Sequence, residues 1–305
     1  MRALLNGKGS LNMEIFVVDN NSEDGSAEMV AKEFPEVNPV RNSSGAFPPA
    51  HPSCQGGIGE AGEAKEQRGI ISNGVKLIAN SDNLGFAKAN NQAIGQAQGD
   101  FILFLNPDMR VFPDTLKNMV EWMRENKQAA VAGCHLVNEK GETIKQIRRF
   151  PKFWDQLMIA LKLPHIFPSV LNKYLQADFD YKKSALVDSI RGSFFMIKRE
   201  TIKKIGLLDE RYFIWFEEVD YCRRVKKAGG QVWYTPSARC LDYVGQSFNQ
   251  LPRGKTRKYF RDSQLAYFKK WQPAWQSWVL KLAWIPGIFM ARAGERIKIK
   301  VEKRT

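Results

Sequence analysis

An aspartate that could bind a metal ion or a phosphate directly follows a strongly apolar run. Phe101 to Leu105 are five consecutive apolar residues, and Asn106-Pro107-Asp108 comes next. An unbroken apolar run is typical of a central strand in a parallel sheet that helices cover on both faces, and proline ends it because it cannot donate to the ladder. Ligands of open α/β sheets bind beyond the carboxyl ends of the strands. Asp108 is therefore our first candidate for a metal ligand, although Asn-Pro-Asp is also ordinary turn chemistry.

A second acid stands in the same relation to an earlier strand. Residues 14–19, E-I-F-V-V-D, form an apolar run that ends at Asp19. A turn-rich cluster follows over 20–26, and 27–34 is predicted to be a helix with Ser22 or Asp24 as its cap. Asp19 is well placed to accept hydrogen bonds from a base or a ribose, and as a loop acid it would be unremarkable.

Three acids open a later helix that could carry proton-transfer chemistry. Glu217-Glu218-Val219-Asp220 begins a segment that continues through Arg224 to Lys227. Acids in the first turn and bases in the last favour the helix dipole, and Asp220 with Arg224 forms an i,i+4 pair. By itself this segment could be a well-capped surface helix.

The elements that must position these acids alternate between strand and helix. This alternation over 14–137 predicts an α/β fold with a doubly wound, mostly parallel, Rossmann-like sheet. Its further elements are strands at 75–79 and 129–137 and helices at 87–98 and 113–126. Beyond it we expect an edge strand at 143–149, helical or irregular structure at 153–175, an interrupted strand at 186–198, a short helix at 200–205, and strands at 231–235 and 239–243.

Residues 38–74 interrupt this pattern. They contain Pro48, Pro49 and Pro52, seven glycines and no apolar period, so a flexible insert with little ordered structure is expected. The four cysteines of the chain form no C-x-x-C pair, and the N-terminus lacks the pattern of a signal peptide. Both observations favour a reducing, cytoplasmic compartment.

The net charge of +14 is concentrated in the last 55 residues. Residues 251–305 carry fourteen Lys and Arg against three acids, which leaves only +3 for residues 1–250. Within this tail, 272–291 is apolar and Trp-rich, but Lys281, Pro286 and Gly287 interrupt it. It is a poor spanning helix and fits a segment that lies on an anionic leaflet. A helix packed on the domain is the alternative.

Six motifs in order resemble the inverting family 2 glycosyltransferases of the GT-A fold, in particular the rhamnosyltransferase-type enzymes of bacterial cell-surface polysaccharide synthesis. The resemblance spans roughly 13–270 apart from the insert. Its motifs are V-V-D-N-N-S-E-D-G-S (17–26), S-D-N-L-G-F-A-K-A-N-N (81–91), F-L-N-P-D (104–108), R-R-F-P (148–151), R-G-S-F-F-M-I-K-R-E (191–200) and G-L-L-D-E-R-Y-F-I-W-F-E-E-V-D-Y-C-R-R-V-K-K-A-G (206–229).

The resemblance implies a hexosyltransferase-type enzyme that moves a sugar from a nucleotide diphosphate to an acceptor hydroxyl. Asp108 would hold a divalent cation, Mg²⁺ or Mn²⁺, that stabilises the leaving diphosphate. The base would be the second acid of Glu217-Glu218, and Asp19 would read the nucleobase. The other positions implied to bind the donor are Asn21, Asp82, Asn83, Lys88, Asn106, Arg191 and Gly192.

Four departures from the family pattern bear on these expectations. The chain begins after the apolar strand with which the family usually opens, and the insert at 38–74 separates strands that relatives join almost directly. Glu218 stands where the family has Asp, and its extra methylene could displace the base by about 1 Å. Asp242 stands where many relatives carry a metal-ligating His, and we expect it to be a second metal ligand.

Three classes of function follow from these features. The leading one is a glycosyltransferase domain at 1–250 with a basic helical tail at 251–305, peripheral on the inner face of a bacterial cell membrane and acting on a glycan or lipid-linked acceptor. The second is an inactive or truncated relic that serves only as a binding module. The third, a nucleic-acid binder, is not expected, because the bases cluster with tryptophans in the tail and no nucleic-acid-binding motif is present.

Overall fold

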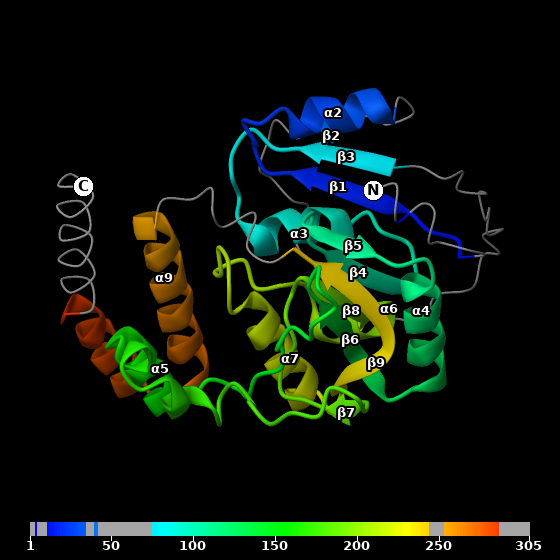
Figure 1. Ribbon diagram of the computed structural model, residues 1–305. Helices are drawn as coiled ribbons and strands as arrows, with labels where there is room; N and C mark the ends of the chain where they lie inside the picture. Colours follow the sequence, from blue (N-terminus) through cyan, green and yellow to red (C-terminus); the bar gives the residue numbers. More distant parts are fainter. Residues whose placement is uncertain (1–3, 5–10, 35–39, 42–74, 244–252, 287–305) are drawn as a thin grey trace, which may run out of the picture. The chain divides into compact units, whose positions relative to one another are not determined.

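The computed structural model describes residue 4 and residues 11–34, 40–41, 75–243 and 253–286 of the chain. Its contacts divide the protein into two compact units (Figure 1). The small unit comprises residues 12–84, and the large unit comprises residues 1–11 and 85–305. Each unit is described separately below.

The small unit is a parallel three-stranded sheet with one helix packed on it. Strands β1 (Ile15–Asp19) and β2 (Val40–Arg41) pair on either side of β3 (Val75–Ala79). Helix α2 (Ser26–Glu33) contacts β3 and buries Val30. The predicted strand at 14–19 and helix at 27–34 are therefore confirmed. Neither Ser22 nor Asp24 caps the helix, because Gly25 occupies the N-cap position with a left-handed φ of 77°.

The region predicted as a flexible insert contributes one short strand to this sheet. Val40 and Arg41 pair with Ile78 and Ala79 of β3. These two residues are ordered within a segment predicted to have little ordered structure, because a backbone ladder needs no apolar period in the sequence. Residues 38–39 and 42–74 lie outside the described part of the chain.

The large unit is built on a second sheet, in the order β4-β8-β6-β9-β5, with β7 paired to β9. Its strands are β4 (Phe101–Leu105), β5 (Met109–Val111), β6 (Ala129–Val137), β7 (Ala185–Leu186), β8 (Phe194–Lys198) and β9 (Gln231–Asp242). Only β6 and β9 are parallel; the other pairs run antiparallel. The strand directions of this sheet are therefore mixed rather than mostly parallel.

Four predicted strands differ in detail. β4 pairs antiparallel with β8, and its apolar residues alternate between buried and half-buried. The two strands expected at 231–235 and 239–243 are one continuous strand, β9, whose register against β6 shifts at a bulge. The edge strand expected at 143–149 is wrong: this segment makes only two isolated bridges, Val137 to Thr143 and Arg148 to Ser189.

Four helices of the large unit cover this sheet or connect its strands. They are α3 (Phe86–Ile94), α4 (Thr115–Glu125), α6 (Arg199–Ile205) and α7 (Glu217–Lys227). α4 and α7 pack on β6 and β9, and α6 packs on β8. The main core lies between them, with Phe104, Phe195 and Tyr221 among its large side chains. These helices confirm the predictions at 87–98, 113–126, 200–205 and from Glu217, with ends that differ by up to four residues.

The C-terminal helices belong to the core of the large unit (Figure 1). α9 (Arg253–Trp271) and a helix over residues 274–286 pack with α5 (Phe153–Ala160), while the short turns η1 (Leu163–His165) and η2 (Pro168–Leu171) follow α5. Tyr267, Phe268 and Leu280 are fully buried against the start of α7. The predicted fold class, α/β with a C-terminal helical segment, is confirmed. No helix in the described residues is both long and apolar enough to cross a bilayer.

Candidate functional site

Asp19 lies at the carboxyl end of β1, as its position in the sequence predicts. It is buried, and its Oδ2 accepts a hydrogen bond from the Ser22 amide at 3.2 Å. The chain turns sharply here, because Asn21 has a left-handed φ of 64°, a conformation that asparagine tolerates better than most residues. The loop after β1 therefore holds the Asp19 carboxylate by its own backbone.

A residue that the sequence analysis did not single out joins this loop to the one after β3. The Asn20 side chain accepts hydrogen bonds from Asn80 Nδ2 at 3.1 Å and from the Leu84 amide at 3.3 Å. Its own amide donates to Asn83 Oδ1 at 3.4 Å. Asp82 is exposed beside these residues. Within the small unit, the structure thus brings Asp19 and Asn21 into one polar cluster with Asp82 and Asn83.

In the large unit, the two predicted metal ligands lie on neighbouring backbones. Asp108 directly precedes β5, whose first residue, Met109, pairs with Asp242 of β9. The Tyr243 amide also donates to the Asp108 carbonyl at 3.1 Å. Asp242 is 3 % exposed and forms an ion pair at 3.3 Å with Arg191 Nη1. The β5–β9 ladder therefore brings together three predicted site residues from distant parts of the sequence.

The residues at this ladder fit a hard divalent cation in their chemistry. Asp108 and Asp242 offer carboxylate oxygens, the donors that Mg²⁺ and Mn²⁺ prefer, and Asn106 precedes them with its amide bonded to the Ser193 carbonyl at 3.0 Å. Within the described part of the chain, no three His, Cys, Asp or Glu side chains form a complete metal cluster. Two carboxylates of the large unit are thus the candidate protein ligands of such a cation.

Glu217 and Glu218 follow an unusual turn at the start of α7. Trp215 and Phe216, immediately before them, both have left-handed φ values, 64° and 68°. Such backbone costs of order 1–3 kcal/mol for non-glycine residues and is typical of functional sites. The Phe216 side chain is buried among the aromatic residues of α9. Packing of this ring thus fixes the turn that presents the two glutamates.

The two glutamates differ in their access to solvent. Glu217 is 4 % exposed, and its Oε2 has no hydrogen-bond partner among the described residues. Glu218 is half-buried and lies against Gly192, where a Cβ would be 3.6 Å from Glu218 Cβ. Gly192 thus lies against the aliphatic part of Glu218. Of the pair, Glu218 is the more exposed residue, and its Oε2 atom, like that of Glu217, is buried without a hydrogen-bond partner among the described residues.

Burial raises the pKa of both glutamates. For Glu217 the burial acts together with the neighbouring charge of Glu218. For Glu218 the effect of burial is opposed by backbone hydrogen bonds and by the positive charges of Arg148 and Arg191. A carboxylate whose pKa is raised by burial suits a general base.

Arg148 belongs to the motif R-R-F-P, which by itself does not indicate a role for this side chain. Its backbone is bridged to Ser189, two residues before Arg191, by hydrogen bonds of 3.5 and 3.3 Å in the two directions. The positive charge of its guanidinium opposes the burial that raises the pKa of Glu218 and of the buried Tyr174 hydroxyl. No local signal could have linked residue 148 with residue 218, since only the folded bridge brings them together.

The remaining acid of this helix, Asp220, is structural. Fully buried, it accepts hydrogen bonds from Arg224 Nε at 3.0 Å, Trp271 Nε1 at 2.6 Å and Tyr212 Oη at 3.2 Å, and it pairs with Lys270 Nζ at 2.7 Å. The predicted i,i+4 pair with Arg224 is thus confirmed. Asp220 fastens α7 to α9.

Lys88 lies half-buried on α3. Asn91, in the same motif, has a structural role. Asn91 donates to the Leu208 carbonyl at 2.9 Å and accepts from the Leu208 amide at 3.0 Å. It also donates to Glu210 Oε1 at 3.0 Å. The motif at 81–91 therefore anchors the loop that leads to the glutamates.

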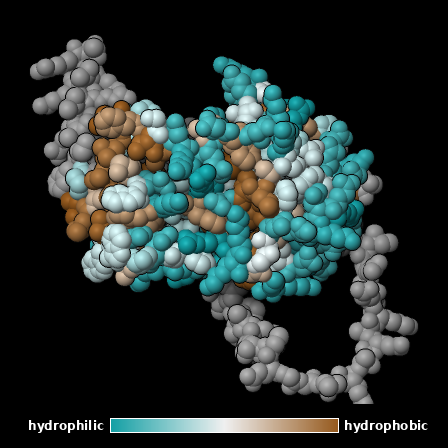
Figure 2. All heavy atoms as spheres, turned by 90° about the horizontal axis from the view of Figure 1, so that it is seen from below, coloured by the Kyte–Doolittle hydropathy of each residue, from teal (hydrophilic) through white to brown (hydrophobic). Residues whose placement is uncertain are grey.

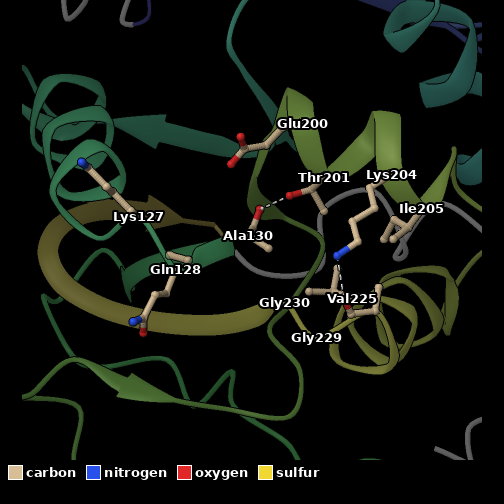
Figure 3. Close-up of a pocket in the computed structure, with 12 residues that line it drawn as sticks. Lys127, Gln128, Ala130, Glu200, Thr201, Lys204, Ile205, Val225, Gly229 and Gly230 are labelled. Atoms are coloured by element: carbon tan, nitrogen blue, oxygen red, sulfur yellow. Dashed lines mark hydrogen bonds between the residues drawn. The ribbon is translucent and has the colours of Figure 1, made fainter.

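A cavity of about 300 Å³ lies away from all the predicted site residues (Figure 3). It is formed between α6 and the end of α7, and its polar groups are used by the fold: Lys204 Nζ donates to the Ala228 carbonyl at 2.8 Å, and Thr201 Oγ1 donates to the Ala130 carbonyl at 3.3 Å. Lys204 thus caps the carboxyl end of α7. This cavity is not the candidate site.

The chain matches a known protein family over part of its length. Residues 62–206 match the family described as Glycosyl transferase family 2. This match covers 145 of the 305 residues and agrees with the motif resemblance.

Two rhamnosyltransferases and one mannosyltransferase are similar to this chain. The chain is 26% identical over 176 residues to the rhamnosyltransferase WbbL of Escherichia coli K12, covering 57% of this chain and 63% of WbbL. It is 25% identical over 227 residues to the N-acetylglucosaminyl-diphospho-decaprenol L-rhamnosyltransferase of Mycobacterium tuberculosis H37Rv, covering 68% of this chain and 72% of the relative. In structure it is similar to the mannosyltransferase PcManGT of Pyrobaculum calidifontis, with a TM-score of 0.47, 16% identity, and coverage of 94% and 71% of the two chains.

Proposed function

We propose that this protein is an inverting glycosyltransferase that moves a sugar from a nucleotide diphosphate to a hydroxyl of a glycan or lipid-linked acceptor in cell-surface polysaccharide synthesis. The observation that carries the proposal is the arrangement in the large unit, where Glu218, a half-buried glutamate with a raised pKa, lies beside Gly192, and Arg191 of the same loop pairs with Asp242. Two relatives are named rhamnosyltransferases, so rhamnose is the first sugar to test.

Glu218 is the proposed base. Its carboxylate takes the proton of the acceptor hydroxyl as the hydroxyl oxygen forms a bond to the anomeric carbon, while the bond from that carbon to the diphosphate oxygen breaks and the diphosphate leaves with the electron pair. Attack from the side opposite the leaving group inverts the anomeric centre. Glu217 is more buried than Glu218, and its proposed role is to begin α7.

The proposed donor contacts are the positions that the motif resemblance implies. Asp19 with Asn21, and Asp82 with Asn83, are the proposed contacts of the base and ribose in the small unit. Lys88, Asn106, Arg191 and Gly192 are the proposed contacts of the diphosphate and sugar in the large unit. Arg191 suits this task because its guanidinium can bind an anionic oxygen in a fixed geometry.

Asp108 and Asp242 are the proposed ligands of a divalent cation, Mg²⁺ or Mn²⁺. When bound there, the cation would neutralise charge that develops on the departing diphosphate. Arg191 already pairs with Asp242, so the same side chain would orient that carboxylate and add positive charge next to the leaving group.

The enzyme is also proposed to act in the cytoplasm, peripherally on the inner face of a bacterial cell membrane. The Mycobacterium tuberculosis relative is named for an acceptor that is linked to a decaprenol lipid. A lipid-linked acceptor of this kind would be reached from the membrane surface.

The first test is calorimetric binding of dTDP, UDP and GDP to the full chain, with and without Mn²⁺. We expect metal-dependent binding of one nucleotide, lost in Asp108→Asn and kept in Asp114→Asn, a matched change at the N-cap of α4. Glu218→Gln should keep this binding and lower kcat by about 10²–10⁴-fold. If none of the nucleotides binds, the glycosyltransferase proposal is wrong and the chain is a binding module that has lost its donor site.

A further inference from the structure

Large apolar side chains are exposed on two neighbouring segments of the large unit. One segment is α5 with the turns η1 and η2, and the other is the helix over residues 274–286. Trp154 and Trp278 are 66 % and 65 % exposed, so most of each indole faces solvent. The full set, here called the aromatic face, is Trp154, Ile166, Phe167, Val170, Trp275, Trp278, Val279, Leu282 and Ile285.

The two segments form one continuous surface. Phe153 of α5 contacts its neighbour Trp154 at a ring distance of 5.2 Å and Trp275 of the other helix at 4.9 Å. Figure 2 shows hydrophobic side chains gathered on the side of the large unit where Figure 1 places α5 and the C-terminal helices. An apolar patch of this extent is rare on a surface that only faces water.

The opposite side of the same helix is firmly packed. Leu280, Ala283 and Trp284 are buried against α5 and α9. A chain of buried hydrogen bonds also ties the helix down: Trp284 Nε1 donates to Gln264 Oε1 at 2.7 Å, and Gln264 Nε2 donates to Gln156 Oε1 at 2.8 Å. The aromatic face is thus a fixed feature of the fold.

Positive charge is concentrated in the C-terminal segment that carries part of this face. Residues 253–286 contain eight Lys and Arg and a single acid, Asp262. Two lysines lie over tryptophan rings: Lys281 Nζ is 5.4 Å from the ring centre of Trp278, and Lys162 Nζ is 5.0 Å from that of Trp284. Half-burial of Lys162 and the nearby charge of Arg257 lower the Lys162 pKa. An anionic partner would relieve this crowding of like charges.

We infer that the aromatic face is a docking surface for an anionic lipid bilayer. Tryptophans with a neighbouring fringe of lysine and arginine are the composition that binds at the headgroup level, where the rings are partly buried and the cations meet anionic lipid. The inference rests on the proposed function in one respect: docking would bring the enzyme to a lipid-linked acceptor. The face itself is defined by exposure and charge.

The test measures flotation of the full-length protein with vesicles. With phosphatidylglycerol and phosphatidylcholine in equal parts we expect strong binding that weakens in high salt, and with phosphatidylcholine alone much weaker binding. The triple variant Trp275→Ser, Trp278→Ser and Leu282→Ser should reduce binding to anionic vesicles at least tenfold. The control is Leu186→Ser with Leu207→Ser, two exposed apolar residues outside the face, which should change nothing.

Two further measurements separate a loss of docking from a loss of stability or of catalysis. Thermal unfolding of the triple variant should stay cooperative, with only a small loss of stability from the Trp275 contact with Phe153, because the buried side of the helix is unchanged. Turnover with a water-soluble acceptor should also be unchanged, so a failure of the proposed chemistry would not be mistaken for a failure of docking. Vesicle binding that the triple variant retains would overturn the inference. Dimers in solution that the triple variant abolishes would overturn it as well, in favour of a second copy of the chain as the partner.

Discussion

Neighbouring acids can differ sharply in what they are able to do. Glu217, Glu218 and Asp220 open one helix, yet the first is almost fully buried, the second is half-buried against Gly192, and the third is saturated by four partners. Residue types and spacing mark this segment as a candidate site but do not separate these environments. Burial and partners, which depend on residues 50 positions away, separate them.

At the residue scale, Arg148 should set the pH dependence of the reaction. Glu218 acts as a base only when ionised, so kcat should rise with pH through its pKa, which burial raises. Arg148 opposes this rise because its positive charge favours the carboxylate. Arg148→Gln should therefore move the rising limb of the pH profile to higher pH. The measurement is kcat as a function of pH for wild type and variant, at low and high salt.

The neighbouring arginine provides the control for this experiment. Arg149 is also exposed, and only its backbone amide contacts Tyr174. Arg149→Gln should leave the rising limb of the kcat–pH profile unchanged. If Arg148→Gln loses activity without a shift of this limb, the assigned role is refuted and the variant has lost structure instead.

At the element scale, the turn before α7 depends on a glycine far away in the sequence. Gly85 precedes α3 with a φ of 81°, and the Phe86 amide donates to the Phe213 carbonyl at 2.7 Å. A Cβ at Gly85 would lie 2.5 Å from that carbonyl oxygen. The motif at 81–91 thus supports the loop that carries Trp215 and Phe216.

Gly85→Ala should therefore destabilise both the fold and the site. We expect a loss of about 2–5 kcal/mol, from the left-handed φ and the steric overlap together, with a fall in kcat as the turn shifts. Gly141→Ala is the matched variant, since Gly141 has a φ of 78° and open space around it; about 1–2 kcal/mol is expected there. Chemical denaturation measures both, and equal losses would show that the Phe213 contact is unimportant.

Most elements of the fold could be predicted, whereas their pairing could not. Strands such as 129–137 and helices such as α7 have strong local signals, and the structure confirms them. The antiparallel pairing of β4 with β8 joins residues almost 100 positions apart, and no periodicity encodes it. Val40–Arg41 became a strand only because the edge of β3 could accept a partner.

At the scale of the whole molecule, the C-terminal helices complete the large unit. Asp220 reaches α9 through Trp271 and Lys270, and Ser263 Oγ donates to the Ile214 carbonyl at 2.8 Å, directly before the strained turn. The positive charge and tryptophans of this segment were evident from the sequence. Its buried side was not, because polar residues such as Gln264 gave no sign of burial.

A chain that ends at residue 252 should therefore fail to fold cooperatively. It would expose the aromatic cluster around Phe216 and leave the Asp220 carboxylate buried without two of its partners, a loss expected to cost several kcal/mol. A chain that ends at residue 286 keeps every contact described here and should unfold at the wild-type temperature. Calorimetry of the two truncated proteins is the measurement, and a stable, cooperative 1–252 fragment would contradict the expectation.

The hydrogen-bonded chain from Trp284 through Gln264 to Gln156 has a mechanical consequence. A flexible anchor lets an enzyme sample many heights above a bilayer, whereas a face fastened through the protein core allows only one. Docked through the aromatic face, the protein would hold Glu218 at a fixed distance from the bilayer surface. The number of sugar and phosphate groups between lipid and acceptor hydroxyl would then decide which glycans can be extended.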